Sequence, residues 1–202
     1  MKKIGLIGDS IGQGFWDETD LGWFARLGRL IKQNYGADYI FNNMSQFGDN
    51  IADAYHRAET EVLSRAFDLI LVNIGINDLR RRKDSHKELD FSEGVRLMYW
   101  NKLLDLLEQT KAKIIITDLL PVVENRYTLD ASLIRRNSDV ERYNEIISAV
   151  CKEHNIAFYA RYNVWQKLNL KELYFDATHP NATGHQLLAE QTLAYLKQQN
   201  LL

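Results

Sequence analysis

Residues from the two ends of the chain have the side chains needed to activate a nucleophile. Ser10 follows the first apolar run, and Asp176 and His179 stand three residues apart near the C-terminus. A serine hydroxyl attacks efficiently when an imidazole takes its proton, and the imidazole works best when a carboxylate fixes its tautomer and stabilises its cation. These residues therefore predict acyl-transfer chemistry, with Ser10 as nucleophile, His179 as general base and Asp176 as its partner.

The hydrophobic pattern indicates which elements must bring these residues together. Apolar runs predict strands at residues 4–7, 39–41, 69–74, 114–116 and 156–159. Apolar residues with helical spacing fill the intervals, and the last helix is predicted to begin near Asn181. The runs are apolar throughout rather than at every second residue, which is typical of a parallel sheet covered on both faces. We therefore predict an α/β fold, a three-layer α/β/α sandwich with a five-stranded parallel sheet.

Nothing in the sequence marks a domain boundary. The chain has no internal repeat, low-complexity tract or proline-rich linker, so we predict a single domain over residues 1–202. Two long stretches, residues 118–139 and 161–176, lack clear periodicity. Because long loops in a compact domain are often functional, we expect these stretches to form walls of a substrate cleft.

Four polar or small residues are predicted to meet at one edge of the sheet. All strands of a parallel sheet end on the same edge, and ligands bind outside those carboxyl ends. Ser10 follows the first strand, Gly48 the second and Asn77 the third, and His179 lies beyond the last. A tetrahedral acyl intermediate needs hydrogen-bond donors aimed at its oxyanion. The backbone N–H groups of Ser10 and Gly48 and the side-chain amide of Asn77 are candidates for this oxyanion hole.

Four segments, in this order, resemble the sequence blocks of the SGNH, or GDSL-type, hydrolase superfamily. They are Gly8-Asp9-Ser10 with Gly14, then Gly48, then Gly75-Ile76-Asn77-Asp78, and last Asp176-Ala177-Thr178-His179-Pro180. The resemblance spans nearly the whole chain. It implies a flavodoxin-like SGNH-hydrolase fold and a cofactor-free serine hydrolase, with the same catalytic and oxyanion-hole residues. Three positions depart from residues frequent in that family: Ile11, Ser45 and Asn50.

A rival interpretation rests on residues 8–12, which also fit the G-x-S-x-G pattern of α/β-hydrolases. In that fold the nucleophile follows a strand deep in the sheet, whereas only one predicted strand precedes Ser10. The carboxylate and the histidine of that fold also lie on separate loops, not three residues apart as Asp176 and His179 do. The positions of these residues therefore favour the SGNH interpretation.

The predicted activity is hydrolysis of a small-molecule carboxylic ester by an esterase, lipase or acylhydrolase, through an acyl-serine intermediate. A carbohydrate O-deacetylase, a thioesterase or an acyltransferase would use the same acyl-serine, and these alternatives stay open. A binding module that holds a ligand without turnover is a further alternative. Such a module would leave the pairing of Asp176 with His179 without a purpose.

Aromatic residues just past Ser10 are candidates for substrate binding. Phe15 and Trp16 could line an acyl or aryl pocket, whereas Trp23 and Phe24 better fit the hydrophobic core.

Charged residues beside the predicted site have several possible uses. Arg80 opens a basic run after Asn77 and is a candidate contact for an anionic substrate. Asp9 is expected to brace the first loop, and Asp78 to cap the helix that follows the third strand. His and Cys show no spacing typical of metal ligands, so no metal site is predicted.

Composition limits the partners and the compartment. The formal net charge of −2 gives no basic field that would concentrate nucleic acid, so nucleic acid is not an expected partner. No stretch approaches the roughly 18 apolar residues that would span a bilayer. The single cysteine excludes an internal disulfide, and the apolar run after Met1-Lys2-Lys3 is too short for a signal peptide. We expect a reduced, cytoplasmic protein whose oligomeric state the sequence does not specify.

Overall fold

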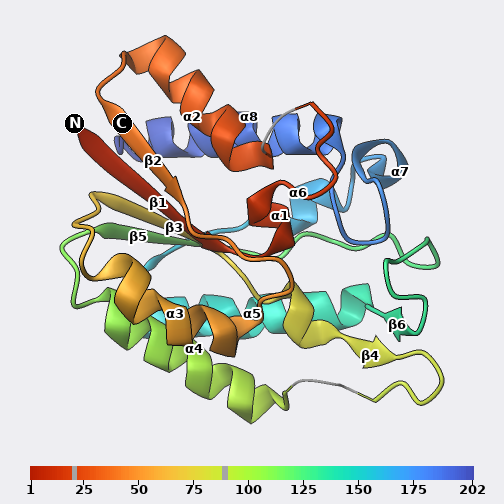
Figure 1. Ribbon diagram of the computed structural model, residues 1–202. Helices are drawn as coiled ribbons and strands as arrows, with labels where there is room; N and C mark the ends of the chain where they lie inside the picture. Colours follow the sequence, from red (N-terminus) through yellow and green to blue (C-terminus); the bar gives the residue numbers. More distant parts are fainter. Residues whose placement is uncertain (20–21, 88–90) are drawn as a thin grey trace.

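A parallel sheet forms the centre of the computed structural model, which describes residues 1–19, 22–87 and 91–202 (Figure 1). Within these residues the five strands are, in spatial order, β2 (Tyr39–Asn43), β1 (Lys2–Gly8), β3 (Leu69–Asn73), β5 (Lys113–Thr117) and β7 (Ala157–Tyr159). Every neighbouring pair in this sheet is parallel. The prediction of a five-stranded parallel sheet is therefore confirmed, with each strand close to its predicted position.

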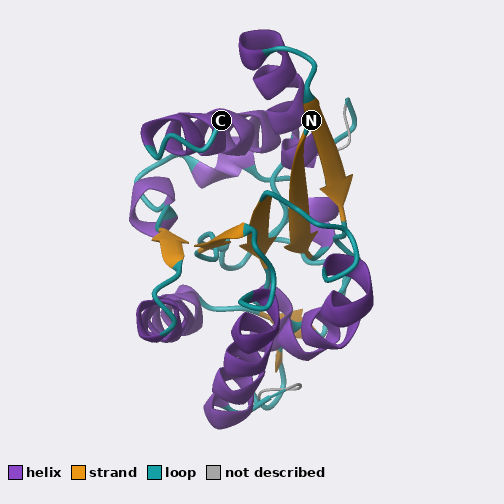
Figure 2. Cartoon of the chain, turned by 90° about the vertical axis from the view of Figure 1, so that its left-hand side faces the viewer, coloured by secondary structure: helices purple, strands orange, loops and turns teal. Residues whose placement is uncertain are grey.

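Helices cover both faces of the sheet, which makes the predicted α/β/α sandwich (Figures 1 and 2). One face carries α2 (Gly22–Tyr35) and α8 (Ala182–Gln198). The other carries α3 (Ile51–Val62), α4 (Glu93–Leu107) and α5 (Asn137–Glu153). Asn181 caps α8, so this helix begins where the sequence predicted.

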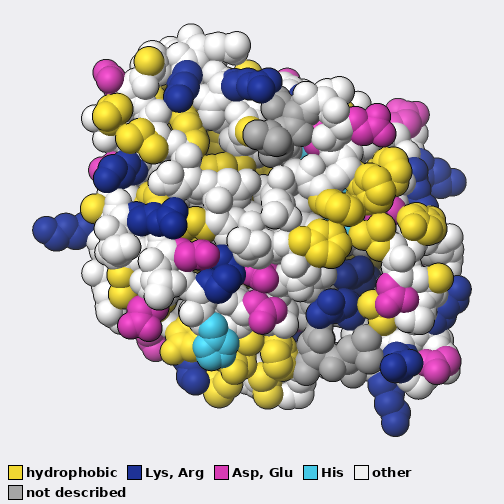
Figure 3. All heavy atoms as spheres, viewed as in Figure 1, with side chains coloured by type: hydrophobic (Ala, Val, Ile, Leu, Met, Phe, Trp, Pro, Cys, Tyr) yellow, Lys and Arg dark blue, Asp and Glu magenta, His cyan; other side chains and the backbone are white. Residues whose placement is uncertain are grey.

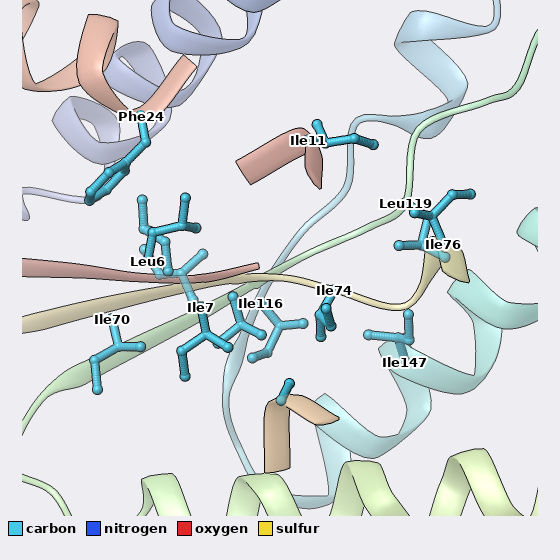
Figure 4. Packing of buried hydrophobic residues seen from close by; sticks show 14 of the residues in the cluster. Leu6, Ile7, Ile11, Phe24, Ile70, Ile74, Ile76, Ile116, Leu119 and Ile147 are labelled. Carbon is cyan, nitrogen blue, oxygen red and sulfur yellow. The ribbon is translucent and has the colours of Figure 1, made fainter. Parts of the chain in front are cut away.

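The strands are apolar throughout because side chains on both faces of the sheet are buried. All five residues of β3 are buried. Successive side chains of a strand point to opposite faces. In Figure 4, accordingly, Leu6 points toward Phe24 of α2, while Ile7 and Ile70 point to the other side of the sheet. The two helix layers therefore pack against opposite faces of the same sheet.

Short elements follow the carboxyl ends of the strands. The one-turn helix α1 (Ser10–Gln13) follows β1, and the 3₁₀ helix η1 (Ile76–Leu79) follows β3. Both lie at the edge of the sheet where the site was predicted.

The two stretches without clear periodicity also contain short elements. Residues 118–139 include β6 (Leu133–Ile134), which pairs antiparallel with β4 (Arg81–Arg82). Residues 161–176 include the one-turn helices α6 (Tyr162–Trp165) and α7 (Leu170–Leu173). Elements of two to four residues are shorter than the window in which hydrophobic periodicity can be recognised, so the sequence did not predict them. Within the described ranges, no helix has both the length and the apolar character required to cross a bilayer.

Two glycines within helices allow the effect of helix propensity on stability to be distinguished from the effect of packing. A Cβ at Gly184 in α8 would lie 2.2 Å from the carbonyl oxygen of Leu173, whereas a Cβ at Gly94 in α4 would meet no atom of the described residues within 4 Å. Propensity alone favours alanine at both positions by roughly 0.5–1 kcal/mol. We expect Gly94→Ala to stabilise the protein by about that amount, and Gly184→Ala to destabilise it by about 1–3 kcal/mol through overpacking.

Urea unfolding of the two variants and the wild type measures both effects. Equal stabilisation by the two substitutions would contradict the close approach of the α8 backbone to the end of α7.

Candidate active site

Ser10 is placed by a sharp change from strand to helix. β1 ends at Gly8, and Asp9 caps α1 because its Oδ1 accepts a hydrogen bond from the Ile11 N–H at 2.9 Å. Ser10 is therefore the first residue of α1, at the carboxyl end of β1, which lies between β2 and β3 in the sheet. Its Oγ lies 2.9 Å from Nε2 of His179, 169 residues away in the sequence.

His179 is held by a tight turn that centres on the Asp176 carboxylate. Oδ1 of Asp176 accepts the backbone N–H groups of Thr178 (2.7 Å) and His179 (2.8 Å), and Oδ2 lies 2.8 Å from Nδ1 of the His179 ring. Burial by itself raises the pKa of Asp176, but its hydrogen bonds and charge interaction with His179 outweigh this and lower the pKa. An ionised carboxylate accepts a proton donor, so Nδ1 carries the hydrogen and the lone pair of Nε2 faces Ser10.

Gly48 and Asn77 lie in the same cleft as Ser10. This cleft has a volume of about 190 Å3, and its walls include Ser10, Gly48, Asn77, Asp176 and His179. Gly48 has a φ of +83°, a backbone conformation that side chains rarely adopt. Within the described part of the chain, the backbone N–H groups of Ser10 and Gly48 have no hydrogen-bond acceptor. The structure thus brings together every residue that the sequence predicted for the triad and the oxyanion hole.

The amide of Asn77 is held at both ends. Its Nδ2 donates to the carbonyl oxygen of Asp49 at 2.9 Å, and its Oδ1 accepts from Nη2 of Arg135 at 2.8 Å. An amide NH2 has two hydrogens, so one N–H remains after the bond to Asp49. That second N–H can serve a ligand in the cleft.

Arg135 is a site residue that the sequence analysis missed. It lies between β6 and α5, in the stretch 118–139 that was expected to line the cleft, and it does line it. Nothing in its sequence neighbourhood distinguishes it from Arg136 beside it. Only the fold brings its guanidinium to Asn77, 58 residues earlier in the chain.

An aromatic side chain packs against the imidazole of His179 and leads to three further rings. The ring of Phe15 meets the imidazole edge-on, with centroids 5.2 Å apart. The ring centroids of Phe15 and Phe47 are 4.8 Å apart. Trp16 stacks on Phe175 with centroids 4.1 Å apart. Phe15 and Trp16 were candidates from the sequence, whereas Phe47 and Phe175 were not.

These four rings contact one another and form a partly exposed aromatic group, of which Phe47 lines the cleft. Phe47 is 53% exposed and Phe175 is 38% exposed. Hydrophobic side chains gather on the side of the molecule toward which the strands run, with Lys and Arg side chains close by (Figure 3). In contrast, Trp23 and Phe24 are almost completely buried, and their prediction as core residues is confirmed. Arg80, the candidate contact for an anionic substrate, lines the cleft.

Two buried polar residues hold the loops of the site. His185 on α8 accepts the N–H of Trp23 at Nδ1 (3.2 Å) and contacts the carbonyl oxygen of Phe15 through Nε2 (3.4 Å). Burial lowers the pKa of His185 to about 4, so the ring is neutral and Nε2 is free to donate. Asp78 accepts the N–H of Ile51 at 3.0 Å. The prediction that Asp78 caps the helix after the third strand is wrong, because its carboxylate reaches the first turn of α3 instead.

Potential metal ligands come together only away from the cleft, as far as the described residues show. Asp105, Glu108 and His154 place ligand atoms within 4.8 Å of one another on the surface of α4 and α5. Both ring nitrogens of His154 already have hydrogen-bond partners, Glu108 and Asn101.

The chain belongs to the GDSL-like lipase/acylhydrolase family, whose sequence model matches residues 6–187. The protein is thus a carboxylic ester hydrolase, as the sequence analysis predicted. An acetylxylan esterase from Geobacillus stearothermophilus is 25% identical in an alignment of 221 positions that covers 95% of this chain and 92% of that protein.

Solved structures show the same fold. The acetyl xylan esterase AlAXEase superposes with a TM-score of 0.79 at 20% identity, over 96% of this chain and 99% of its own. A lipase/acylhydrolase from Enterococcus faecalis superposes with a TM-score of 0.78, also at 20% identity, over 98% and 97% of the two chains. The predicted SGNH-hydrolase fold is confirmed.

Asp9 gives the site a measurable pH dependence of stability. Burial raises the pKa of Asp9 from 3.8 to about 6, although the Ile11 N–H and the nearby His179 lower it. The folded protein then binds the proton more tightly than the unfolded chain, so this contribution to stability is complete below about pH 4 and is lost as the pH rises through 6. At about 1.4 kcal/mol for each pKa unit, the loss amounts to about 3 kcal/mol.

The variant Asp9→Asn keeps an oxygen for the Ile11 N–H and removes the charge. We expect it to gain about 3 kcal/mol relative to the wild type between pH 4 and pH 7, measured by urea unfolding at both pH values. A stability difference between wild type and variant that does not change with pH would contradict a raised pKa at Asp9.

Proposed function

We propose that Ser10, His179 and Asp176 are the catalytic residues of this ester hydrolase. The proposal rests on one observation, the continuous chain of hydrogen bonds from the Asp176 carboxylate through the His179 ring to the Ser10 hydroxyl, at 2.8 and 2.9 Å. A binding module would not require a serine hydroxyl to be paired with an oriented imidazole.

Acylation begins when Nε2 of His179 takes the proton of the Ser10 hydroxyl. Oγ attacks the carbonyl carbon of the ester, and the electron pair of the C=O π bond moves to the carbonyl oxygen. The Asp176 carboxylate stabilises the imidazolium that forms. Collapse of the tetrahedral intermediate re-forms the C=O bond and expels the alcohol, which receives the proton from His179.

Deacylation repeats these steps with water in place of serine. His179 takes a proton from the water, the hydroxide attacks the acyl carbon, and Ser10 leaves with the proton returned by His179. Donors for the oxyanion in both steps are the N–H groups of Ser10 and Gly48 and the amide of Asn77. Removing one such donor typically costs about 3 to 4 kcal/mol of transition-state stabilisation.

We further propose that the natural substrate is a short-chain ester, specifically an O-acetylated sugar. A cleft of about 190 Å3 favours a small acyl group. The likeness to an acetylxylan esterase over 95% of this chain supports acetyl as that group. Thioesters and other acyl acceptors would use the same acyl-serine, but no feature of the cleft favours them.

The alcohol part of the substrate is proposed to lie against the aromatic group that includes Phe15 and Phe47. Phe15 packs against His179, Phe47 lines the cleft, and Trp16 and Phe175 extend this aromatic group. Binding sites commonly combine such aromatic walls with a few polar groups that fix orientation. Arg80 lines the same cleft and is proposed as one of these polar groups.

Composition supports the remaining parts of the proposal. Cys151 is buried, and burial raises the pKa of its thiol to about 12, so it acts as a core residue. A protein without disulfides does not need an oxidising compartment, and we infer a cytoplasmic location. With a net charge of −2, we propose a small-molecule ester rather than nucleic acid as the partner.

Replacement of the nucleophile tests the catalytic assignment. We expect Ser10→Ala to lower kcat for p-nitrophenyl acetate by about 10⁴-fold or more, because the hydroxyl proposed to form the acyl-enzyme is removed. Labelling by a fluorophosphonate probe is expected to disappear. Ser64→Ala, at an exposed serine, is the control and should keep both the ester turnover and the labelling of the wild type. Undiminished turnover by a folded Ser10→Ala variant would refute the assignment.

A series of p-nitrophenyl esters tests the size of the acyl group. We expect kcat/KM to fall by at least about tenfold from acetate to octanoate, a loss of about 1.4 kcal/mol in transition-state binding. Release of acetate from acetylated xylan, followed by an acetate assay, tests the sugar ester. Preference for octanoate, or no acetate release, would overturn the substrate assignment while leaving the triad in place.

A further inference from the structure

Arg135 connects the two halves of the site. Its Nε donates to the carbonyl oxygen of Ile76 at 2.9 Å, and its Nη2 donates to Oδ1 of Asn77 at 2.8 Å. Its Nη1 donates to Oγ1 of Thr178 at 3.2 Å. The first two acceptors belong to η1, which carries the oxyanion-hole amide, and the third belongs to the turn that carries His179.

We propose that Arg135 is the positioning residue of the oxyanion hole, and that it acts on the reaction through the Asn77 amide. This inference rests on the proposed function, since it assumes that Asn77 donates to the oxyanion. Arg135 itself need not touch the substrate.

The guanidinium determines which end of the Asn77 amide faces the cleft. The two ends of a side-chain amide have nearly the same shape, so packing alone distinguishes them poorly. A guanidinium has only donors and therefore requires Oδ1 on its side. The carbonyl oxygen of Asp49 accepts from Nδ2 and requires the opposite end on its own side. Together Arg135 and Asp49 direct an N–H, not a carbonyl oxygen, toward the cleft.

The charge of Arg135 also strengthens that donor. A hydrogen bond from a cation to the amide oxygen is stronger than a neutral one, and it polarises the amide so that its N–H groups become better donors. The Asn77 side chain is buried, where such polarisation is weakly screened by water. The benefit is greatest when negative charge develops on the substrate oxygen, which makes it a transition-state effect.

The bond to Thr178 sets the distance between the oxyanion hole and the catalytic base. Thr178 directly precedes His179, and its backbone N–H is fixed by the Asp176 carboxylate. Catalysis is sensitive to misplacements of about 1 Å in such groups. Lysine could not replace Arg135, because a single ammonium lacks the planar fork that reaches three acceptors at once.

The test compares Arg135→Ala and Arg135→Lys in the wild type and in Asn77→Ala. With p-nitrophenyl acetate as substrate, we expect Arg135→Ala to lower kcat by about 10-fold to 100-fold and to change KM by less than about threefold. Arg135→Lys should give an intermediate kcat. In the Asn77→Ala background, the same Arg135 substitutions should lower kcat by less than about twofold, because their target is already gone.

Matched controls separate positioning from general damage. Arg136→Ala removes the same charge at the next position, where the side chain bonds to His86, and it should leave kcat unchanged. Thermal unfolding reports whether each variant is folded. If Arg135→Ala does not fold, Arg135→Lys carries the same comparison.

Three outcomes would overturn the inference. The first is an unchanged kcat in Arg135→Ala, and the second is a fully active Arg135→Lys. The third is a loss of kcat that is as large in the Asn77→Ala background as in the wild type, which would mean that Arg135 does not act through the amide. Failure of the proposed function would look different, since a folded Ser10→Ala would then remain active whatever the Arg135 variants do.

Discussion

The site depends on the buried hydrogen-bond chain that links Asp176, His179 and Ser10. Each of these three residues is at most 7% exposed as a whole, so each polar group must be satisfied within the protein. The Asp176 carboxylate meets this requirement by accepting from Thr178 and from both the backbone and the ring of His179. One group thereby shapes the turn, orients the ring and selects its tautomer. Most other features of the site keep this chain in register with the donors that we propose for the oxyanion.

The parallel sheet supplies that register because its strands end together. Ser10, Gly48 and Asn77 follow three adjacent strands, so their backbones emerge at one edge within a single cleft. Buried polar residues outside the triad then fix the loops. His185 holds the segment after Ser10, and Asp78 joins η1 to the start of α3. These residues show that a buried histidine or aspartate near a cleft can serve the geometry rather than the reaction.

Sequence patterns predicted the sheet and the meeting of Ser10, His179 and Asp176 because both depend on regular rules. A buried parallel strand is a continuous apolar run, and residues after such strands share one edge. The wrong or missing predictions concern contacts between distant segments. The Asp78 carboxylate accepts from the first turn of α3 rather than capping the helix after the third strand. Phe47 and Phe175 come from separate loops and pack against Phe15 and Trp16. No local pattern records such contacts.

By itself the sequence determined the order of the main strands and helices and pointed to the hydroxyl, imidazole and carboxylate that we propose to react, since these follow from hydrophobic periodicity and functional groups. Only the tertiary structure decided which polar groups orient them. Arg135 and Arg136 are adjacent and chemically identical, yet one bonds to Asn77 and the other to His86. Their difference arises from the direction in which the backbone between β6 and α5 projects each side chain, and that direction is set by packing between segments far apart in the chain.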